Sequence, residues 1–211
     1  MKQIDLETWN RKDHFMHFSK MDYPQFNICM DIDISNFLIY TKSKKLSFYY
    51  SMIYAVSQVL NTIDNFKYRI RDGKVILHEK IHPSFTCINK DANDDLFKII
   101  TVDLADDMAE FEKAAKETSE KQKSLFDSTT SSYRDDLIYI TCIPWIAFTH
   151  VSHPITLNKC DSVPRISWGK YYKCGEKTML PFSMQVNHAL ADGFHVGKYI
   201  EKLQLYIDEL Q

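Results

Sequence analysis

The stretch "MLPFSMQVNHALADGFHVGKYIEKLQLYIDEL", residues 179–210, decides the fold. Its first part has a period of two, which is typical of a β-strand whose alternate side chains share one face. One face of this strand carries the apolar row Leu180, Phe182, Met184 and Val186, which His188 closes. The opposite face carries Ser183, Gln185 and Asn187. The pattern therefore predicts a strand that ends in a histidine.

The second part of the stretch has helical periodicity. Its apolar residues recur at steps of four and three, namely Val196, Ile200, Leu203, Ile207 and Leu210. Asp192 stands one short turn after His188 and can cap this helix, and Gly193 relaxes the turn. We therefore expect a strand–turn–helix unit with an imidazole at the junction and a carboxylate beside it.

Three roles are open to His188 from its local sequence. It can be a structural core histidine whose ring nitrogens are satisfied by neighbours. It can be a general base, because burial keeps imidazole neutral at pH 7 and leaves one nitrogen free to accept a proton. It can be a metal ligand, but for the two close histidine pairs, His14 with His17 and His150 with His153, no carboxylate or cysteine completes a convincing ligand set in the sequence,. We expect no metal.

The rest of the chain alternates irregularly between the two periodicities. In order, it predicts a helix at 6–21, a strand at 26–37, a helix at 47–63, a hairpin at 68–88, a strand at 96–104, a helix at 106–126, a strand at 136–153 and a strand pair at 165–189. Asp72-Gly73 is a typical two-residue hairpin turn. This order predicts an α+β fold with a mixed, largely antiparallel sheet and packed helices, in a single domain spanning 1–211.

Composition narrows the function classes. The 211 residues carry a formal net charge of −2, so neither nucleic acid nor an anionic membrane is an expected partner,. The five cysteines are scattered without a C-x-x-C pair, which disfavours a disulfide framework,. No apolar run resembles a signal sequence or approaches the roughly 18 residues of a membrane span. We expect a cytoplasmic protein.

The motif at the junction resembles a known family. Residues 188–193, "HALADG", match the H-x-x-x-D-G motif of CoA-dependent acyltransferases, and the chain is similar to chloramphenicol acetyltransferases in particular. The likeness also covers "TWNRKDHF" (8–15), "FKYRIRDGKVILHEKIHPSFT" (66–86), "IPWIAFT" (143–149) and "GKYYKCGEKTMLPFSMQV" (169–186). It implies that family's two-layer fold and direct acetyl transfer from acetyl-CoA to a hydroxyl of chloramphenicol or a related acceptor.

The resemblance also assigns roles to residues. His188 is implied to be the general base, with Asp192 paired to Arg11 to hold the turn that presents it. Lys170 and Tyr171 match residues beside the CoA channel. A homotrimer is implied, in which the histidine of one subunit faces an acceptor site built mainly by the next.

Five positions depart from the family pattern. His150 stands where the family has its oxyanion-stabilising serine, and Ser167 stands at the water-holding threonine. On the N-terminal helix, His17-Phe18 replaces a Phe-Tyr pair of the acceptor site, and Asn187 replaces a histidine. Two alternatives therefore stay open: acetyl transfer to a different alcohol or thiol, and a CoA- or small-molecule-binding homologue with impaired turnover.

Overall fold

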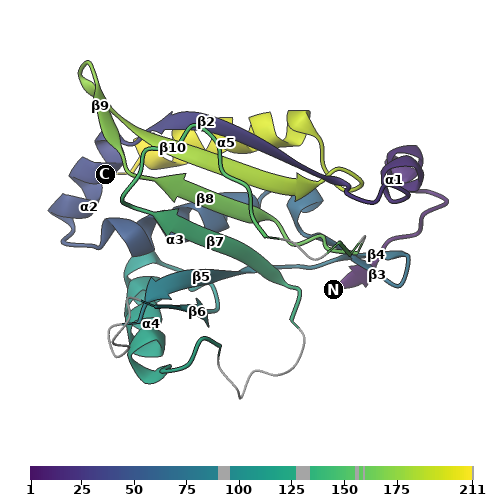
Figure 1. Ribbon diagram of the computed structural model, residues 1–211, viewed down its shortest axis with the longest axis horizontal. Coiled ribbons are helices and arrows are strands. Elements are labelled where there is room, and N and C mark those ends of the chain that lie inside the picture. Colours follow the sequence, from purple (N-terminus) through teal and green to yellow (C-terminus); the bar gives the residue numbers. More distant parts are fainter. Residues whose placement is uncertain (90–95, 127–133, 155–156, 159, 211) are drawn as a thin grey trace.

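A seven-stranded β-sheet is the central element of the fold (Figure 1). The computed structural model describes residues 1–89, 96–126, 134–154, 157–158 and 160–210. The sheet's strand order is β2-β10-β8-β7-β5-β6, and β9 pairs with β10 beside that path. A smaller sheet has the order β1-β4-β3.

The bounds of the elements are as follows. The strands are β1 Lys2–Gln3, β2 Gln25–Asp33, β3 Tyr68–Arg71, β4 Lys74–Leu77, β5 His82–Ile88, β6 Phe97–Thr101, β7 Leu137–Ile143, β8 Arg165–Gly169, β9 Tyr172–Cys174 and β10 Lys177–Asn187. The helices are α1 Lys12–Phe18, α2 Ser35–Ser43, α3 Phe48–Leu60, α4 Met108–Lys121 and α5 Gly193–Asp208, with a short 3₁₀ turn at Asp64–Phe66.

The pairing of the strands confirms a mixed sheet. β7 runs parallel to both β5 and β8. The pairs of β10 with β2, β8 and β9 are antiparallel, as is the pair of β5 with β6. The fold is thus α+β with a largely antiparallel sheet. The predicted hairpin is present over β3 and β4, where Asp72 and Gly73 both have positive φ, 49° and 74°, as a primed two-residue turn requires,. It is shorter than the expected 68–88, because residues 82–88 form β5 of the large sheet.

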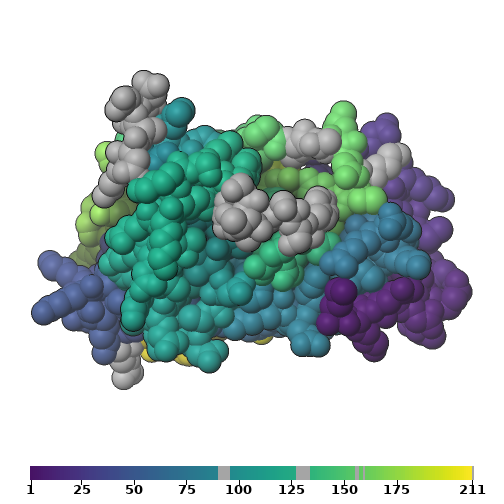
Figure 2. Space-filling model, turned by 90° about the horizontal axis from the view of Figure 1, so that it is seen from below, coloured from purple at the N-terminus to yellow at the C-terminus, as the bar shows by residue number. Residues whose placement is uncertain are grey.

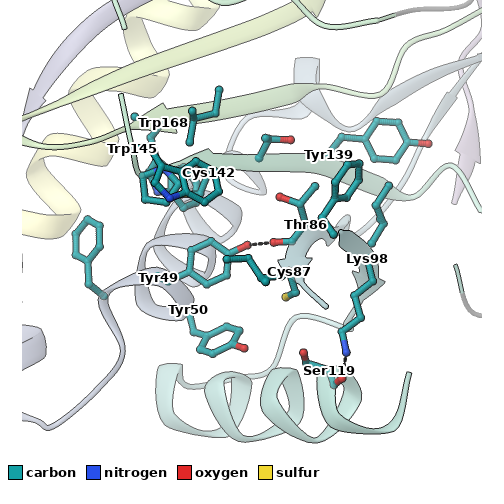
Figure 3. Close-up of a pocket in the computed structure, with 18 of the residues that line it drawn as sticks. Tyr49, Tyr50, Thr86, Cys87, Lys98, Ser119, Tyr139, Cys142, Trp145 and Trp168 are labelled. Carbon is teal, nitrogen blue, oxygen red and sulfur yellow. Dashed lines mark hydrogen bonds between the residues drawn. The ribbon is translucent and has the colours of Figure 1, made fainter. Parts of the chain in front are cut away.

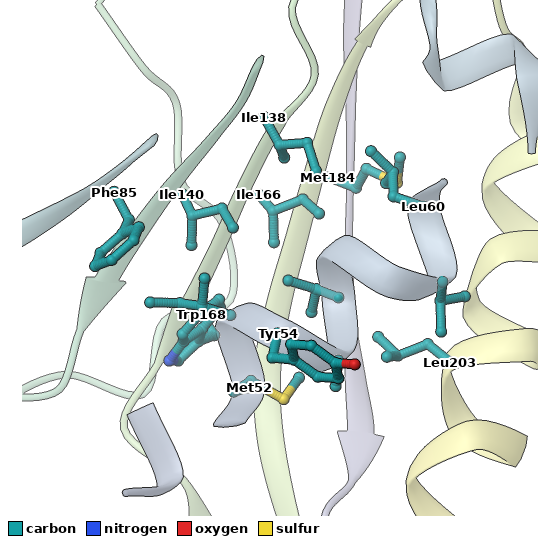
Figure 4. Packing of buried hydrophobic residues seen from close by; sticks show 14 of the residues in the cluster. Met52, Tyr54, Leu60, Phe85, Ile138, Ile140, Ile166, Trp168, Met184 and Leu203 are labelled. Atoms are coloured by element: carbon teal, nitrogen blue, oxygen red, sulfur yellow. The ribbon is translucent and has the colours of Figure 1, made fainter. Parts of the chain in front are cut away.

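Helices cover one face of the large sheet. Buried side chains of α3 and α5 meet those of the central strands, so that Met52, Ile140, Ile166, Met184 and Leu203 share one hydrophobic cluster (Figure 4). α4 packs against α3 and β6. Fully burying one such aliphatic side chain contributes about 1.5–3 kcal/mol, so this interface is the main source of stability.

The strand–turn–helix unit is built as its periodicity indicates. The apolar row of β10 is buried in this core, and so is the row at Ile32 and Ile34 that leads out of β2. Asp192 is the N-cap of α5: its side chain accepts from the Phe194 N–H, and His195 completes a capping box. Leu210 lies beyond the end of the helix at Asp208 but still packs against the core.

Three element predictions were wrong in extent. The N-terminal helix is shorter than 6–21, because α1 begins only at Lys12. The strand expected at 26–37 ends at Asp33, whose carboxylate accepts from the backbone N–H and the hydroxyl of Ser35 and so starts α2. The strand expected at 136–153 ends at Ile143, directly before Pro144, which cannot donate to the next ladder position,. No helix of the described residues is long and apolar enough to cross a membrane.

Candidate active site

The backbone of His188 is fixed on both sides. Its N–H donates to the carbonyl of Pro24, with 2.7 Å between nitrogen and oxygen. Its own carbonyl accepts from Nη2 of Arg11 at 2.9 Å. Because Arg11 precedes α1 and Pro24 precedes β2, two distant parts of the chain hold the end of β10 in place.

Arg11 and Asp192 form an ion pair at this junction. Nη1 of Arg11 lies 2.8 Å from Oδ2 of Asp192, and Nε donates to the carbonyl of Ala189 at 3.1 Å. The guanidinium thus bridges both ends of the turn between β10 and α5. Partial burial on its own raises the pKa of Asp192, but the hydrogen bond from Arg11 and the charges of His195 and Arg11 lower it to about 2. The carboxylate is therefore ionised at any physiological pH.

The imidazole of His188 is held by aromatic rings. Phe18 stacks on it with 3.8 Å between ring centroids and 6° between planes. Phe26 lies against it at 4.7 Å, tilted by 49°. These contacts hold the plane of the ring without using either of its nitrogens.

Neither ring nitrogen of His188 has a hydrogen-bond partner among the residues that the structure describes. Nδ1 is buried without a hydrogen-bond partner. Nε2 makes no hydrogen bond to any residue that the structure describes. Structural histidines in protein cores normally have satisfied nitrogens, and an unpaired one calls for a functional explanation. This geometry speaks against the structural-core alternative and leaves Nε2 free to accept a proton.

Asn187 anchors the same turn from the other strand face. Its Nδ2 donates to the carbonyl of Asp161 at 2.9 Å, and its Oδ1 accepts from the Ala189 N–H at 2.9 Å. The histidine of the family pattern would make different hydrogen bonds at this position. Asn187 is thus a turn-stabilising residue that leaves His188 untouched.

A large cavity opens where the sheet divides. β5 pairs with β7 only as far as Phe85 and Ile140, after which β5 follows β6 to Ile88 and β7 follows β8 to Ile143. A cavity of about 1470 Å³ lies between the diverging pairs and is closed by α3 and α4. Figure 3 shows Tyr49 and Cys87 on one side of it and Cys142 on the other. Cavities of several hundred Å³ or more are large enough for small-molecule ligands.

Several aromatic rings line the cavity, among them Tyr49 and Trp168. Tyr49 donates from its hydroxyl to the Thr86 carbonyl, and its ring lies 6.1 Å from that of Trp168. Tyr171 and Lys170 are exposed on one rim, where the ring of Tyr171 meets that of Phe48 edge-on at 5.9 Å. Burial raises the pKa of the Cys142 thiol in this wall to about 12, so it is a packing group rather than a nucleophile.

His188 does not line this cavity. The cavity reaches α4, whereas the C-terminal end of β10 lies beside α1, and the two helices are at opposite ends of the molecule in both views (Figures 1 and 2). A single chain therefore keeps its candidate base and its large cavity apart.

The remaining candidate residues are scattered over these two regions. His17 is exposed on α1 and meets the Phe18 ring edge-on at 5.0 Å, so it lies near His188. His150 is exposed, with Nδ1 3.9 Å from Sγ of Cys29, and lines no cavity described here. Ser167 is fully buried, and its Oγ lies 3.1 Å from Nε2 of His153.

Sequence analysis missed most of the residues around the cavity. Tyr49 and Trp168 lie in stretches whose apolar periodicity predicted only a helix and strands, and the sequence raised only metal binding as a role for His153. Their convergence depends on the division of the sheet. Among the described residues, no group of three or more His, Cys, Asp or Glu side chains could hold a metal ion.

Solved structures share this architecture. A chloramphenicol acetyltransferase superposes with a TM-score of 0.87 at 22% identity, over 98% of this chain and 100% of its own. The dihydrolipoamide acetyltransferase of Azotobacter vinelandii superposes with a TM-score of 0.71 at 15% identity, over 99% and 92% of the two chains. The protein therefore has the CoA-dependent acyltransferase fold.

Sequence comparison narrows the class to one family. The sequence model of chloramphenicol acetyltransferase matches residues 1–204. The chain is 30% identical to the chloramphenicol acetyltransferase of Bacillus pumilus, over 98% of this chain and 93% of that protein. It is 28% identical to an Escherichia coli chloramphenicol acetyltransferase, over 99% and 94%. The chain belongs to the chloramphenicol acetyltransferase family.

Proposed function

We propose that the protein transfers an acetyl group from acetyl-CoA to a hydroxyl of chloramphenicol or a related acceptor in the cytoplasm. The observation that carries the proposal is His188, whose backbone is fixed on both sides while both of its ring nitrogens lack partners among the described residues. A fixed imidazole with a free nitrogen is what proton abstraction from an alcohol requires.

The chemistry follows from this arrangement. Nε2 of His188 takes the proton of the acceptor hydroxyl as its oxygen attacks the thioester carbonyl, and the CoA thiolate leaves. Stacking on Phe18 keeps the imidazole plane of His188 in the orientation that points Nε2 at that hydroxyl, and the Arg11–Asp192 pair fixes the backbone of His188. Transfer is direct, without an acyl-enzyme. A well-placed base contributes about 10²–10⁴-fold, and the alignment of two substrates contributes further.

The cavity fits the two substrates of such a reaction. Its largely apolar walls with several aromatic rings suit the pantetheine arm and an aromatic acceptor, and the positive charge of Lys170 at the rim suits a phosphate of CoA,. Because His188 does not line the cavity of its own chain, we propose a homotrimer in which it faces the cavity of the next subunit. A symmetric trimer repeats one such heterologous contact three times.

The test is an acetyl-transfer assay that follows free thiol from acetyl-CoA with chloramphenicol as acceptor. We expect turnover that falls by about 10²–10⁴-fold in His188→Ala with unchanged thermal stability. His14→Ala removes an exposed histidine of α1 and is the matched control, with wild-type rate. Binding of acetyl-CoA by calorimetry without turnover of chloramphenicol or of any alcohol in a broad panel would refute the proposal in favour of a binding protein.

A further inference from the structure

A second imidazole lines the cavity. His153 is partly buried in its wall, and Nε2 lies 3.1 Å from the Ser167 hydroxyl. His150, which is three residues earlier, is exposed and does not line the cavity. The chain segment that carries both histidines therefore turns only His153 toward the enclosed space.

The position of this segment is fixed from the sheet beneath it. Nδ2 of Asn27 in β2 donates to the carbonyl of Val151 at 2.7 Å, and Oδ1 of Asn27 accepts from the Ser183 hydroxyl at 2.8 Å. Ser183 in β10 stands directly opposite Ser167 in β8. A row of small polar side chains across three neighbouring strands thus holds the backbone two residues before His153.

The burial of Ser167 determines the tautomer of His153. Ser167 is 0% exposed, and the only hydrogen-bond partner of its hydroxyl within the described chain is Nε2 of His153. A buried hydroxyl proton without an acceptor costs free energy, so the hydroxyl donates to Nε2. Nε2 is then the unprotonated nitrogen, and the ring proton lies on Nδ1.

The ring remains neutral near pH 7. Burial, followed by the nearby charge of Arg165, lowers the pKa of His153 below its usual value. Arg165 itself pairs with Asp161 at 2.6 Å and lies over the Tyr139 ring at 5.5 Å, so it does not occupy Nδ1. Nδ1 makes no hydrogen bond to the described residues and is not fully buried. It is a fixed, neutral N–H donor in a largely apolar wall.

We propose that His153 is a specificity-determining residue whose Nδ1–H donates a hydrogen bond to an oxygen of the acceptor substrate, with Ser167 as the residue that positions the ring. The inference rests on the proposed function. It assigns the acceptor a chemical class: alcohols that carry a second oxygen close to the reacting hydroxyl. A site built to donate one hydrogen bond discriminates strongly against analogues that lack the accepting oxygen.

A pair of acceptors that differ by one hydroxyl tests the assignment. With 1-phenyl-1,3-propanediol and 3-phenyl-1-propanol, the wild type should favour the diol by about tenfold or more in kcat/KM. His153→Leu should abolish this preference by raising the KM of the diol, with the KM of acetyl-CoA within about twofold of the wild-type value. His153→Asn keeps an N–H donor and should restore most of the preference. Ser167→Ala should weaken it partially, since the ring loses its positioning bond.

A preference that survives in His153→Leu would overturn the proposal, as would a change confined to the KM of acetyl-CoA. A readout independent of turnover is the ring tautomer. Nitrogen-15 NMR should show His153 protonated at Nδ1 in the wild type, and the Nδ1 form should lose its dominance in Ser167→Ala. Protonation at Nε2 in the wild type would refute the inferred donor. If the wild type acetylates no alcohol, the proposed function fails, whereas the NMR result still decides the inferred tautomer.

Discussion

The ion pair between Arg11 and Asp192 predicts a specific loss of stability when either partner is removed. The pKa of Asp192 falls from 3.8 to about 2, and each pKa unit corresponds to about 1.4 kcal/mol, so the ionised carboxylate contributes about 2.5 kcal/mol to folding,. We therefore expect Asp192→Asn to lower the free energy of unfolding by about 2–3 kcal/mol at pH 7. For a chain of this length that corresponds to a decrease in Tm of roughly 5–10 °C.

The pH dependence of this loss has a defined sign. Because the pKa of Asp192 is depressed in the folded state, its contribution is complete above about pH 4 and disappears as the pH falls through about 2,. The stability difference between the wild type and Asp192→Asn should therefore shrink steadily from pH 4 to pH 2. Arg11 is only 8% exposed, so Arg11→Ala should destabilise by a similar amount and also release the His188 carbonyl.

The assay is urea unfolding of both single variants and the double variant at one fixed protein concentration, since assembly would shift the apparent stability. The double variant should lose about 1–2 kcal/mol less than the sum of the single variants, because the two residues interact directly. Arg134→Ala is the control: it removes a partly exposed arginine that pairs with Asp136 at 2.9 Å, and should cost less than about 1 kcal/mol,. Additive losses, or a loss below about 0.5 kcal/mol for Asp192→Asn, would refute the reasoning.

Two further predictions concern the cavity rim. A Cβ on Gly169 would lie 2.5 Å from the Ile146 carbonyl oxygen, so Gly169→Ala should destabilise the protein by about 1–3 kcal/mol in thermal unfolding,. The control is Gly197→Ala in α5, where a Cβ would meet nothing within 4 Å, and this variant should be stabilised by up to about 1 kcal/mol,. Equal effects of the two substitutions would contradict the close approach at Gly169. Lys170→Ala should raise the KM of acetyl-CoA about threefold to tenfold at low salt and less at high salt,. The control, Lys44→Ala, lies outside the cavity lining and should leave this KM unchanged. An unchanged KM in Lys170→Ala would show that Lys170 does not contact CoA.

The part of the fold that is visible in the sequence is the part fixed by local periodicity. The rows of β10 and α5 have one buried face each, and their period alone places His188 at the junction and Asp192 at the cap. The start of α2 was missed for the same reason. Ile32 and Ile34 continue the apolar alternation of β2, and the break after Asp33 depends on a carboxylate that turns back to Ser35.

The division of the sheet is not visible in any local pattern. It depends on which strand β5 follows after Phe85 and which strand β7 follows after Ile140, and the pairs of β7 with β5 and β8 join segments that are distant in the sequence. The same limit applies to the His153–Ser167 pair, because the two residues lie 14 positions apart on a loop and a strand. The free nitrogens of His188 required three-dimensional contacts, since its local sequence also fits a satisfied core histidine.

The central claim is that His188 of one subunit acts in the cavity of the next. It is tested most directly by mixing two inactive variants: His188→Ala, which lacks the base, and Thr141→Trp, which fills the cavity that Thr141 lines. Each variant alone should assemble normally and show no turnover. Co-assembled at random in equal amounts, the two should give about 25% of wild-type activity, because about three quarters of the cyclic trimers are then mixed and every mixed trimer has one complete site out of three. Mixed trimers that remain as inactive as the parents would contradict the account.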